Sequence, residues 1–281
     1  MVILSNDDLY VEISETGAEI RKVTLGGKER FWNGDEKYWT GVSPVLFPIC
    51  SGVPDGKFSF EGKEYSLEKH GFARKSVFTV ESQSGSFATF LLKDSPETLK
   101  IYPWNFELRV TYALVGNNIN VTYDVKNTSE STMYYSIGAH EAYLCESGIE
   151  DYDVIFEKKE TLDSYLLDGS LLSGKKIPII KDSNILPLYD KYFTQDALVF
   201  KDVKSRFVTL RNRKTGEEVS VRFDGFDYFL LWHKFGAPYM CIEPWAGICN
   251  TVGDSNDITK KEGIIKLNSG ENNILKHTIY F

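Results

Sequence analysis

Glu243 is a carboxylate inside an apolar run, a setting that suits an acid–base catalyst. Residues 237–247 read Ala-Pro-Tyr-Met-Cys-Ile-Glu-Pro-Trp-Ala-Gly. Because the side chains of a strand alternate between its two faces, Glu243 is expected to share a face with Tyr239, Cys241 and Trp245. A carboxylate on such an aromatic surface is a candidate catalytic base, and the alternative is a glutamate in a structural salt bridge.

His140 is a second polar residue in a setting that is unusual for the surface. It ends the expected strand 134–140, in which alternation places Ser136 and Gly138 on the same face. The small Gly138 is expected to leave space for a ligand, whereas the alternative is a histidine hydrogen-bonded within a core or rim. Pro244 cannot donate to a sheet ladder, which predicts that the strand carrying Glu243 ends or leaves the sheet there.

Three further polar residues are candidates for binding. His70 and Arg74 lie in the segment 68–74, where Gly71 permits a tight turn and the arginine adds a planar donor. Asp196 directly precedes an apolar strand and is expected to point toward the same rim. The alternatives are a solvated basic turn for the first segment and an Asx cap for the aspartate.

Other chemistries fit the sequence less well. Pairs such as HxH or HExxH are absent, so no metal is expected, and without a P-loop, GxGxxG or GxSxG motif no nucleotide cofactor or serine nucleophile is expected. His233 and His277 read as ordinary sheet or turn residues. Glu243 and Asp196 could supply the two carboxylates of a glycosidase, so that alternative stays open.

The composition restricts the class of protein and its partners. The 281 residues are 42% hydrophobic and 14% aromatic, which is enough for a large core. A net charge of -8 with scattered basic residues argues against nucleic acid and anionic membranes as partners. The four cysteines lack CxxC spacing and read as free, mostly buried thiols. With no leader-like or membrane-spanning run, a cytoplasmic location is expected.

Period-2 alternation recurs along the chain and predicts an all-β fold. The clearest example is a hairpin of residues 106–114 and 119–125. Similar strand pairs are expected around the turns at 61–63, 83–86, 214–216 and 268–271. Only residues 34–39 and 95–100 are expected to make helical turns.

The organisation predicted for residues 1–281 is a single domain. No linker, low-complexity segment or repeat divides the chain. We therefore expect two large antiparallel sheets packed face to face, with a broad concave face for a ligand. Residues 147–195 are expected to form loops and short strands at a rim, and the sequence does not distinguish a monomer from a dimer.

Nearly the whole chain resembles the aldose 1-epimerase, or galactose mutarotase-like, family. The resemblance implies the large β-sandwich of that family, called a supersandwich, and a reaction that opens and recloses a pyranose ring to interconvert α and β anomers. The residues that carry it are Gly17–Glu19, Tyr38–Trp39, Pro44–Pro48, His70–Arg74, Tyr102–Pro103, Ile137–His140, Asp196–Leu198 and Cys241–Trp245.

Motif matching with the family implies a catalytic pair. Glu243 would be the base that removes the proton of the C1 hydroxyl, and His140 the acid that protonates the ring oxygen. A partly dry setting would raise the pKa of the glutamate from about 4.3 toward neutrality, while an imidazole near 6.5 is already suited to donate.

Binding roles follow from the same resemblance. His70 would hydrogen-bond the sugar near its ring oxygen, and Asp196 would accept from sugar hydroxyls. Trp245 or Trp232 could offer a face to the pyranose. The implied partner is thus a small monosaccharide, and no cofactor is implied.

The chain departs from the family pattern at two places. Relatives commonly read Phe-Pro-Ile-x-Gly-Arg where residues 47–52 end in Gly52, so either Arg74 replaces the missing arginine or the function has changed. The loss argues against a phosphorylated sugar, since phosphate sites prefer clustered Arg and Lys. Residues 140–143 read His-Glu-Ala-Tyr instead of His-Pro-x-Phe.

The leading hypothesis is a cofactor-independent aldose 1-epimerase-like isomerase that acts on an unphosphorylated hexose. The alternative is a sugar-binding protein that kept the cleft and lost turnover, because of the glycine at position 52. A third hypothesis is a carbohydrate-cleaving enzyme on the same scaffold.

Overall fold

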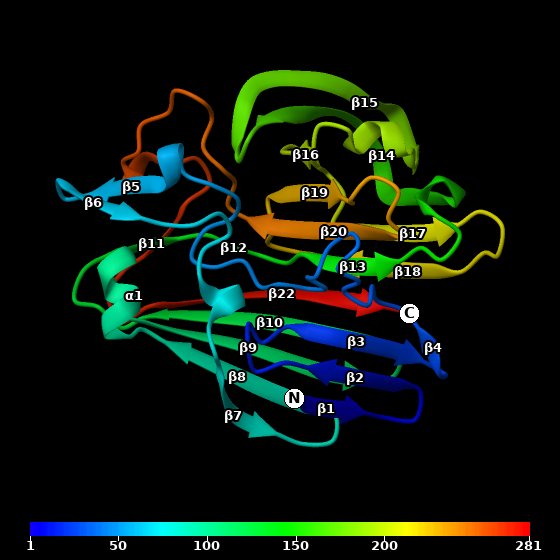
Figure 1. The fold of residues 1–281 in the computed structure, drawn as a ribbon, viewed down its shortest axis with the longest axis horizontal. Helices are drawn as coiled ribbons and strands as arrows, with labels where there is room; N and C mark the ends of the chain where they lie inside the picture. Colours follow the sequence, from blue (N-terminus) through cyan, green and yellow to red (C-terminus); the bar gives the residue numbers. More distant parts are fainter.

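The computed structural model describes residues 1–281, and its regular structure is almost entirely β-strand (Figure 1). One antiparallel sheet of 14 strands contains most of the 22 strands. Its spatial order is β12 (Ile137–Gly138), β20 (Tyr239–Ala246), β19 (Tyr228–Trp232), β16 (Leu198–Phe200), β14 (Tyr152–Asp168), β17 (Phe207–Asn212), β18 (Glu218–Arg222), β22 (Asn272–Tyr280), β10 (Asn118–Asn127), β9 (Phe106–Val115), β8 (Phe87–Lys93) and β7 (Thr79–Gln83). In addition, β13 (Glu141–Leu144) pairs with β20, and β15 (Leu171–Pro187) pairs with β14.

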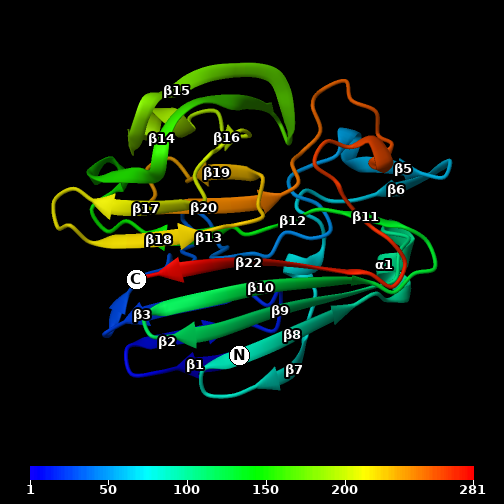
Figure 2. The same ribbon diagram turned by 180° about the vertical axis from the view of Figure 1, so that it is seen from behind.

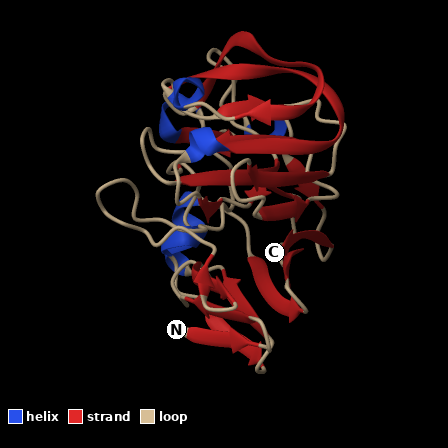
Figure 3. Ribbon diagram, turned by 90° about the vertical axis from the view of Figure 1, so that its right-hand side faces the viewer, coloured by secondary structure: helices blue, strands red, loops and turns tan.

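Smaller sheets and short helical turns complete the fold. A four-stranded sheet contains β1 (Val2–Ser5), β2 (Leu9–Ile13), β3 (Ile20–Leu25) and β4 (Lys28–Glu29). Two-stranded sheets pair β5 (Lys57–Phe60) with β6 (Lys63–Ser66), and β11 (Met133–Tyr135) with β21 (Ile265–Leu267). The one α-helix is α1 (Pro96–Ile101), and 3₁₀ turns cover Pro54–Gly56, Ala73–Lys75, Ile149–Asp151, Asp190–Phe193 and Ile258–Lys260. Figure 3 shows how little helix there is beside the strands.

The strands form facing layers because most of them bury one face. In β9 and β10 buried and half-buried residues alternate along the whole strand, as expected for a sheet with one face on a core. The sheet of β1–β4 lies against the part of the large sheet formed by β8, β9 and β10, on the near side in Figure 1 and the far side in Figure 2. A single apolar cluster of 67 buried residues includes side chains of both layers, so the all-β sandwich is confirmed.

Several local predictions are confirmed. The hairpin of residues 106–125 is β9–β10, and the turns near 62, 84 and 215 connect β5–β6, β7–β8 and β17–β18. Helix α1 begins after Ser95, which forms a capping box with Thr98. All four cysteines are free and buried.

The region 147–195 contradicts the prediction of loops and short strands. It holds β14 and β15, two strands of 17 residues each, which arch over one end of the large sheet (Figure 1). Their pairing is interrupted by several register shifts, and only three of the 17 residues of β15 are buried. In β14 burial alternates, but polar Glu160 and Ser164 stand at buried positions, so the sequence does not show a regular apolar alternation. Similarly, the turn at 268–271 does not join a paired hairpin, because β21 pairs with β11.

A buried polar pair connects β22 and β13, which lie in different parts of the large sheet. His277 Nε2 of β22 lies 2.9 Å from Glu141 Oε1 of β13, and both side chains are almost fully buried. The ring of Tyr123 packs 5.6 Å from that of His277. His277 therefore partners an acidic side chain that would otherwise be alone in the core.

No helix of the structure is long and apolar enough to cross a membrane. The single domain and the cytoplasmic location stay predictions.

Candidate active site

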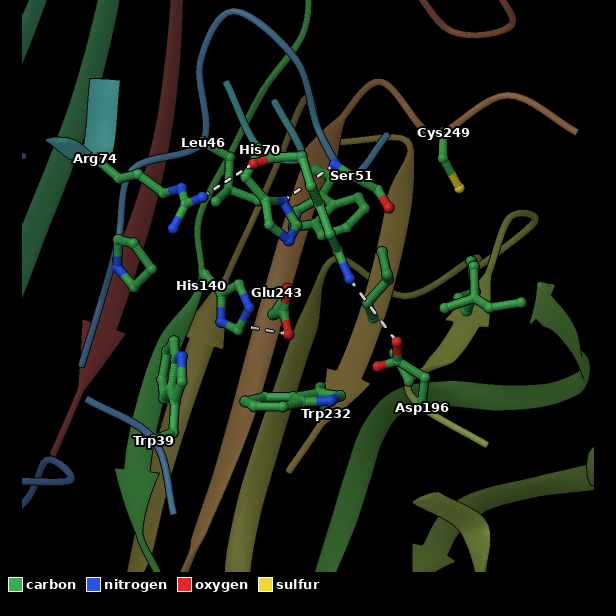
Figure 4. A pocket seen from close by; sticks show the side chains of 17 residues that line it. Trp39, Leu46, Ser51, His70, Arg74, His140, Asp196, Trp232, Glu243 and Cys249 are labelled. Carbon is green, nitrogen blue, oxygen red and sulfur yellow. Dashed lines mark hydrogen bonds and ion pairs between the residues drawn. The ribbon is translucent and has the colours of Figure 1, made fainter. Parts of the chain in front are cut away.

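One pocket of about 310 Å³ brings together the residues that the sequence singled out for chemistry or binding. Glu243, His140, His70, Arg74 and Asp196 all line it (Figure 4). The volume lies near the lower end of the range for small-molecule sites. Its floor is the face of β19 and β20, and the segments around residues 44–51 and 68–74 form part of its walls.

His140 and Glu243 lie opposite each other on neighbouring strands. The register of β12 and β13 against β20 places the two residues across from one another, on the face that forms the pocket floor. His140 Nδ1 is 3.5 Å from Glu243 Oε1, and their side chains are 10% and 2% exposed. His140 Nδ1 has no hydrogen-bond partner, so this nitrogen is available to a ligand or a proton.

Pro244 interrupts the sheet beside this pair without ending the strand. The N–H of Ala139 donates to the carbonyl of Pro244, but proline has no N–H with which to return the bond. The carbonyl of Ala139 instead accepts a hydrogen bond from Trp245 Nε1 at 3.1 Å. The prediction that the strand ends or leaves the sheet at Pro244 is therefore wrong, because β20 continues to Ala246 and stays paired with β19 through Pro244. Only the ladder toward β12 and β13 is interrupted.

Aromatic rings fix the orientation of the His140 imidazole. Trp39 stacks on it with ring centroids 5.0 Å apart, and Trp232 meets it edge-on at 5.6 Å. The space that Gly138 was expected to leave for a ligand is filled by Trp245, since a Cβ at Gly138 would lie 2.5 Å from the indole ring. Trp39 belongs to a segment that carries the resemblance, but its contact with His140 was missed, because the two residues are 101 positions apart in the sequence.

Burial shifts the pKa values of the pair in opposite directions. Loss of water, aided by the charge of Asp196, raises the pKa of Glu243 well above its usual range, against the opposing effect of Lys69. Burial lowers the pKa of His140 to about 3, with smaller contributions from Lys69 and Arg74. The expected rise for the glutamate is confirmed, whereas the expectation of an ordinary imidazole near 6.5 is wrong.

These shifts predict how Glu243→Gln changes stability. A carboxyl whose pKa is higher in the folded than in the unfolded state keeps its proton in the native state after the unfolded chain has released it. The free energy of unfolding therefore falls as pH rises from the unfolded pKa toward the folded pKa. The loss is at most about 1.4 kcal/mol per pH unit. Glu243→Gln should therefore melt at a higher temperature than wild type, by a margin that grows as pH rises above about 4.5. The His140 contribution, lost between about pH 6.5 and 3, is present in both proteins and cancels.

Melting curves between pH 4 and 9 measure this margin. The matched control is Glu107→Gln, because Lys93 and Arg109 lower the pKa of Glu107 to about 2 and the sign must reverse. A margin for Glu243→Gln that does not depend on pH would contradict the desolvated carboxyl.

His70 is held in one tautomer by the backbone. The N–H of Ser51 donates to His70 Nδ1 at 3.1 Å, and burial, followed by the charge of His140, lowers the pKa of His70 well below 6.5. A neutral ring that accepts at Nδ1 carries its proton on Nε2. His70 can therefore act as a hydrogen-bond donor, and its φ of 67° places it in the left-handed turn that the sequence assigned to Gly71, which is also left-handed.

Two cations and one carboxylate lie at the pocket rim. Lys69 Nζ is 3.8 Å from Asp196 Oδ2, too far for a hydrogen bond, and Arg74 donates to the carbonyl of Lys69 at 3.2 Å while its Nε has no partner. Asp196 adopts a φ of 94°, a strained conformation of the kind that clusters at functional sites. Sequence reasoning missed Lys69. Because Lys69 and Arg74 share one pocket, the argument against a phosphorylated sugar loses its basis.

The glycine at position 52 is explained by the β14–β15 hairpin. Ser170, at the tip of this hairpin, lies so close that a Cβ at Gly52 would be 2.2 Å from its hydroxyl. The carbonyl of Ser170 accepts hydrogen bonds from the Ser51 hydroxyl at 2.9 Å and the Gly52 N–H at 3.3 Å. The tip therefore occupies the space that a side chain at position 52 would need.

Ligand atoms of His140, Cys241 and Glu243 all lie within 4.8 Å of one another, and all three residues are buried. The reasoning from the sequence looked for closely spaced ligands and missed this group, because His140 comes from a distant strand. The signal was the Cys-x-Glu spacing at residues 241 and 243, which places both side chains on one face of a strand.

Comparisons with known proteins agree with this architecture. Residues 1–276 match the family model described as aldose 1-epimerase. The plasmid-encoded protein LacX of Lactococcus lactis subsp. lactis is 33% identical over 279 residues, which covers 94% of this chain and 93% of LacX. Among solved structures, a galactose mutarotase related enzyme from Lactobacillus acidophilus is 30% identical, with a TM-score of 0.94 over 99% of this chain and 96% of that one.

A galactose mutarotase-like protein from Lactobacillus casei has the same TM-score of 0.94 at 26% identity, over 100% of this chain and 99% of that one. The family match thus extends over almost the whole chain, from β1 to the last strand, β22. On these grounds the chain belongs to the aldose 1-epimerase family.

Proposed function

We propose that this protein is an aldose 1-epimerase that interconverts the α and β anomers of a free aldose. The observation that carries the proposal is the buried pair of Glu243 and His140 on the floor of a pocket of sugar size. Ring opening needs a base at the C1 hydroxyl and an acid at the ring oxygen, held close together. The pair supplies one group of each kind.

The reaction begins with the pair in its charged form. The Glu243 carboxylate removes the C1 hydroxyl proton while the His140 imidazolium protonates the ring oxygen, and the bond between C1 and that oxygen breaks. After rotation about the C1–C2 bond, the neutral imidazole removes the proton from the hydroxyl that was the ring oxygen, and this oxygen attacks C1. The protonated carboxyl gives its proton to the C1 carbonyl oxygen, and the other anomer forms. Both groups end as they began, so the cycle needs no cofactor.

The pKa shifts of Glu243 and His140 indicate that the bound sugar must favour the charged form of the pair. In the empty pocket, burial favours the neutral arrangement, with the proton on the carboxyl and not on the imidazole. Moving this one proton from Glu243 to His140 creates the reactive form without exchange with solvent. Hydrogen bonds from the sugar hydroxyls would stabilise the charged form and so prepare the pair for the reaction.

The remaining pocket residues would bind and orient the sugar. His70 is proposed to donate from Nε2 near the ring oxygen, and Asp196 to accept from hydroxyls. Arg74 is proposed to replace the arginine that relatives carry at position 52, since it lines the pocket and its Nε is unpaired. Trp232 would provide an apolar face for the pyranose.

Optical rotation tests the proposal directly. Purified protein should accelerate the change in rotation of freshly dissolved α-D-glucose or α-D-galactose above the rate in buffer. Because Lys69 and Arg74 share the pocket, the same assay should include α-D-glucose 6-phosphate. Saturable sugar binding without acceleration of any of these sugars would instead favour the binding-protein alternative, and new reducing ends from an oligosaccharide would favour glycoside cleavage.

A further inference from the structure

The floor of the pocket holds three side chains with the chemistry of metal ligands. The imidazole of His140, the thiol of Cys241 and the carboxyl of Glu243 have ligand atoms within 4.8 Å of one another. In a tetrahedral site with bond lengths of about 2.0 to 2.3 Å, ligand atoms are separated by roughly 3.3 to 3.7 Å. Small rotamer adjustments therefore suffice to bring the three atoms to a common centre.

The strand geometry explains why these three residues meet. Cys241 and Glu243 are two positions apart on β20, so both project from the same face. His140 lies opposite Glu243, at the gap between β12 and β13. Nδ1 of His140 has no hydrogen-bond partner although the residue is only 8% exposed. This buried nitrogen lies 3.5 Å from Glu243 Oε1 without a hydrogen bond, and it belongs to a residue grouped with a thiol and a carboxyl, which is the observation that points to a ligand.

We infer that His140, Cys241 and Glu243 form a binding site for a thiophilic divalent cation, with Zn²⁺ the best match to one nitrogen, one sulfur and one oxygen ligand. Binding releases the protons of the thiol and of the carboxyl to solvent, because both groups coordinate as anions. The two negative charges then cancel the charge of the cation. A neutral complex avoids the cost of a buried charge, despite the nearby cations Lys69 and Arg74.

The fourth coordination position would face the pocket. His140 and Glu243 line the cavity, whereas Cys241 lies beneath its surface and does not. Three protein ligands with an open fourth position are the arrangement that accepts water or a substrate oxygen. A bound cation would occupy the lone pairs that acid–base catalysis needs. The cation would therefore inhibit the enzyme in competition with the sugar. This expected inhibition rests on the proposed function, whereas the binding of the cation does not.

Titration with Co²⁺ tests the site without any activity assay, because a thiolate bound to Co²⁺ gives a charge-transfer absorption band. Wild type should develop this band with one equivalent of Co²⁺ and lose it when Zn²⁺ is added. Cys241→Ser should not develop it, while Cys249→Ser, which changes another thiol at the same pocket, should keep it. If Cys241→Ser does not fold, Cys241→Ala removes the same ligand.

Two results would overturn the inference: no thiolate band in wild type, or a band that persists without Cys241. The inhibition half is measured by the mutarotation rate with Zn²⁺, each variant being compared with its own rate in EDTA. Zn²⁺ should inhibit wild type at concentrations at least tenfold lower than those that inhibit Cys241→Ser, and EDTA should restore the rate. A thiolate band in a protein that accelerates no sugar would contradict the proposed function and leave the metal site intact.

Discussion

Glu243→Gln should lower the kcat of catalysed mutarotation by roughly 10²- to 10⁴-fold, the range that a positioned acid–base group contributes. Glutamine keeps the size and the hydrogen-bonding ability of the side chain, but its amide cannot remove the C1 proton. Because the sugar still meets the same pocket, KM should change much less than kcat. The measurement is the initial rate of change of optical rotation as a function of sugar concentration.

Variants of His140 provide a second test of the proposed pair. His140→Asn should cause a loss of similar size, and the double variant should be only slightly worse than either single variant, because the two groups act as one unit. The control is Glu64→Gln in the exposed β5–β6 hairpin, which should keep the wild-type rate. Wild-type acceleration that survives Glu243→Gln within a few fold would place the base elsewhere and remove the basis of the proposed mechanism.

His277→Leu should destabilise the protein by about 3 to 5 kcal/mol, because it leaves the buried carboxyl of Glu141 without its partner. The pair lies in the core between β13 and β22, where no water replaces the lost hydrogen bond. Urea unfolding measures the free energy. The fall should appear in the midpoint of the transition, while its slope stays the same.

The double variant Glu141→Leu/His277→Leu distinguishes a lost partner from a damaged core. Replacing both members of a buried pair by apolar groups of similar size is often neutral or stabilising. The double variant should therefore recover most of the loss. If it is as unstable as His277→Leu, the histidine contributes through packing, for example against Tyr123, and not through the carboxylate.

The sequence predicted those parts of the fold whose pattern repeats locally. The hairpin β9–β10 was predicted because each strand buries one face, so its alternation survives in the sequence. The arch of β14 and β15 was not, because β15 buries few residues and β14 has polar residues, Glu160 and Ser164, at buried positions. The hairpin predicted around residues 268–271 is absent because β21 pairs with β11, which lies more than 100 residues earlier in the sequence.

The candidate site was predicted through polar residues in unusual settings, and its supporting residues were not. Glu243 and His140 stood out because a carboxylate and an imidazole are rare in apolar strands. Trp39 and Lys69 did not, since an aromatic residue or a lysine is ordinary in a loop. Cys241 was treated as a buried thiol because its relation to His140 depends on strand register, which one sequence does not provide.

The contact between the hairpin tip and Gly52 means that the shape of the pocket wall and the position of the Glu243–His140 pair depend on different parts of the chain. Glu243 stands on β20 and His140 lies opposite it between β12 and β13, whereas the wall at Ser170 belongs to the β14–β15 hairpin, which arches over this end of the large sheet. Positions 52 and 170 are steric alternatives, so a chain with an arginine at 52 must route its hairpin differently. A substitution at this wall can therefore change which ligands the pocket admits while Glu243 and His140 stay in place, so a new specificity would not require a new arrangement of that pair.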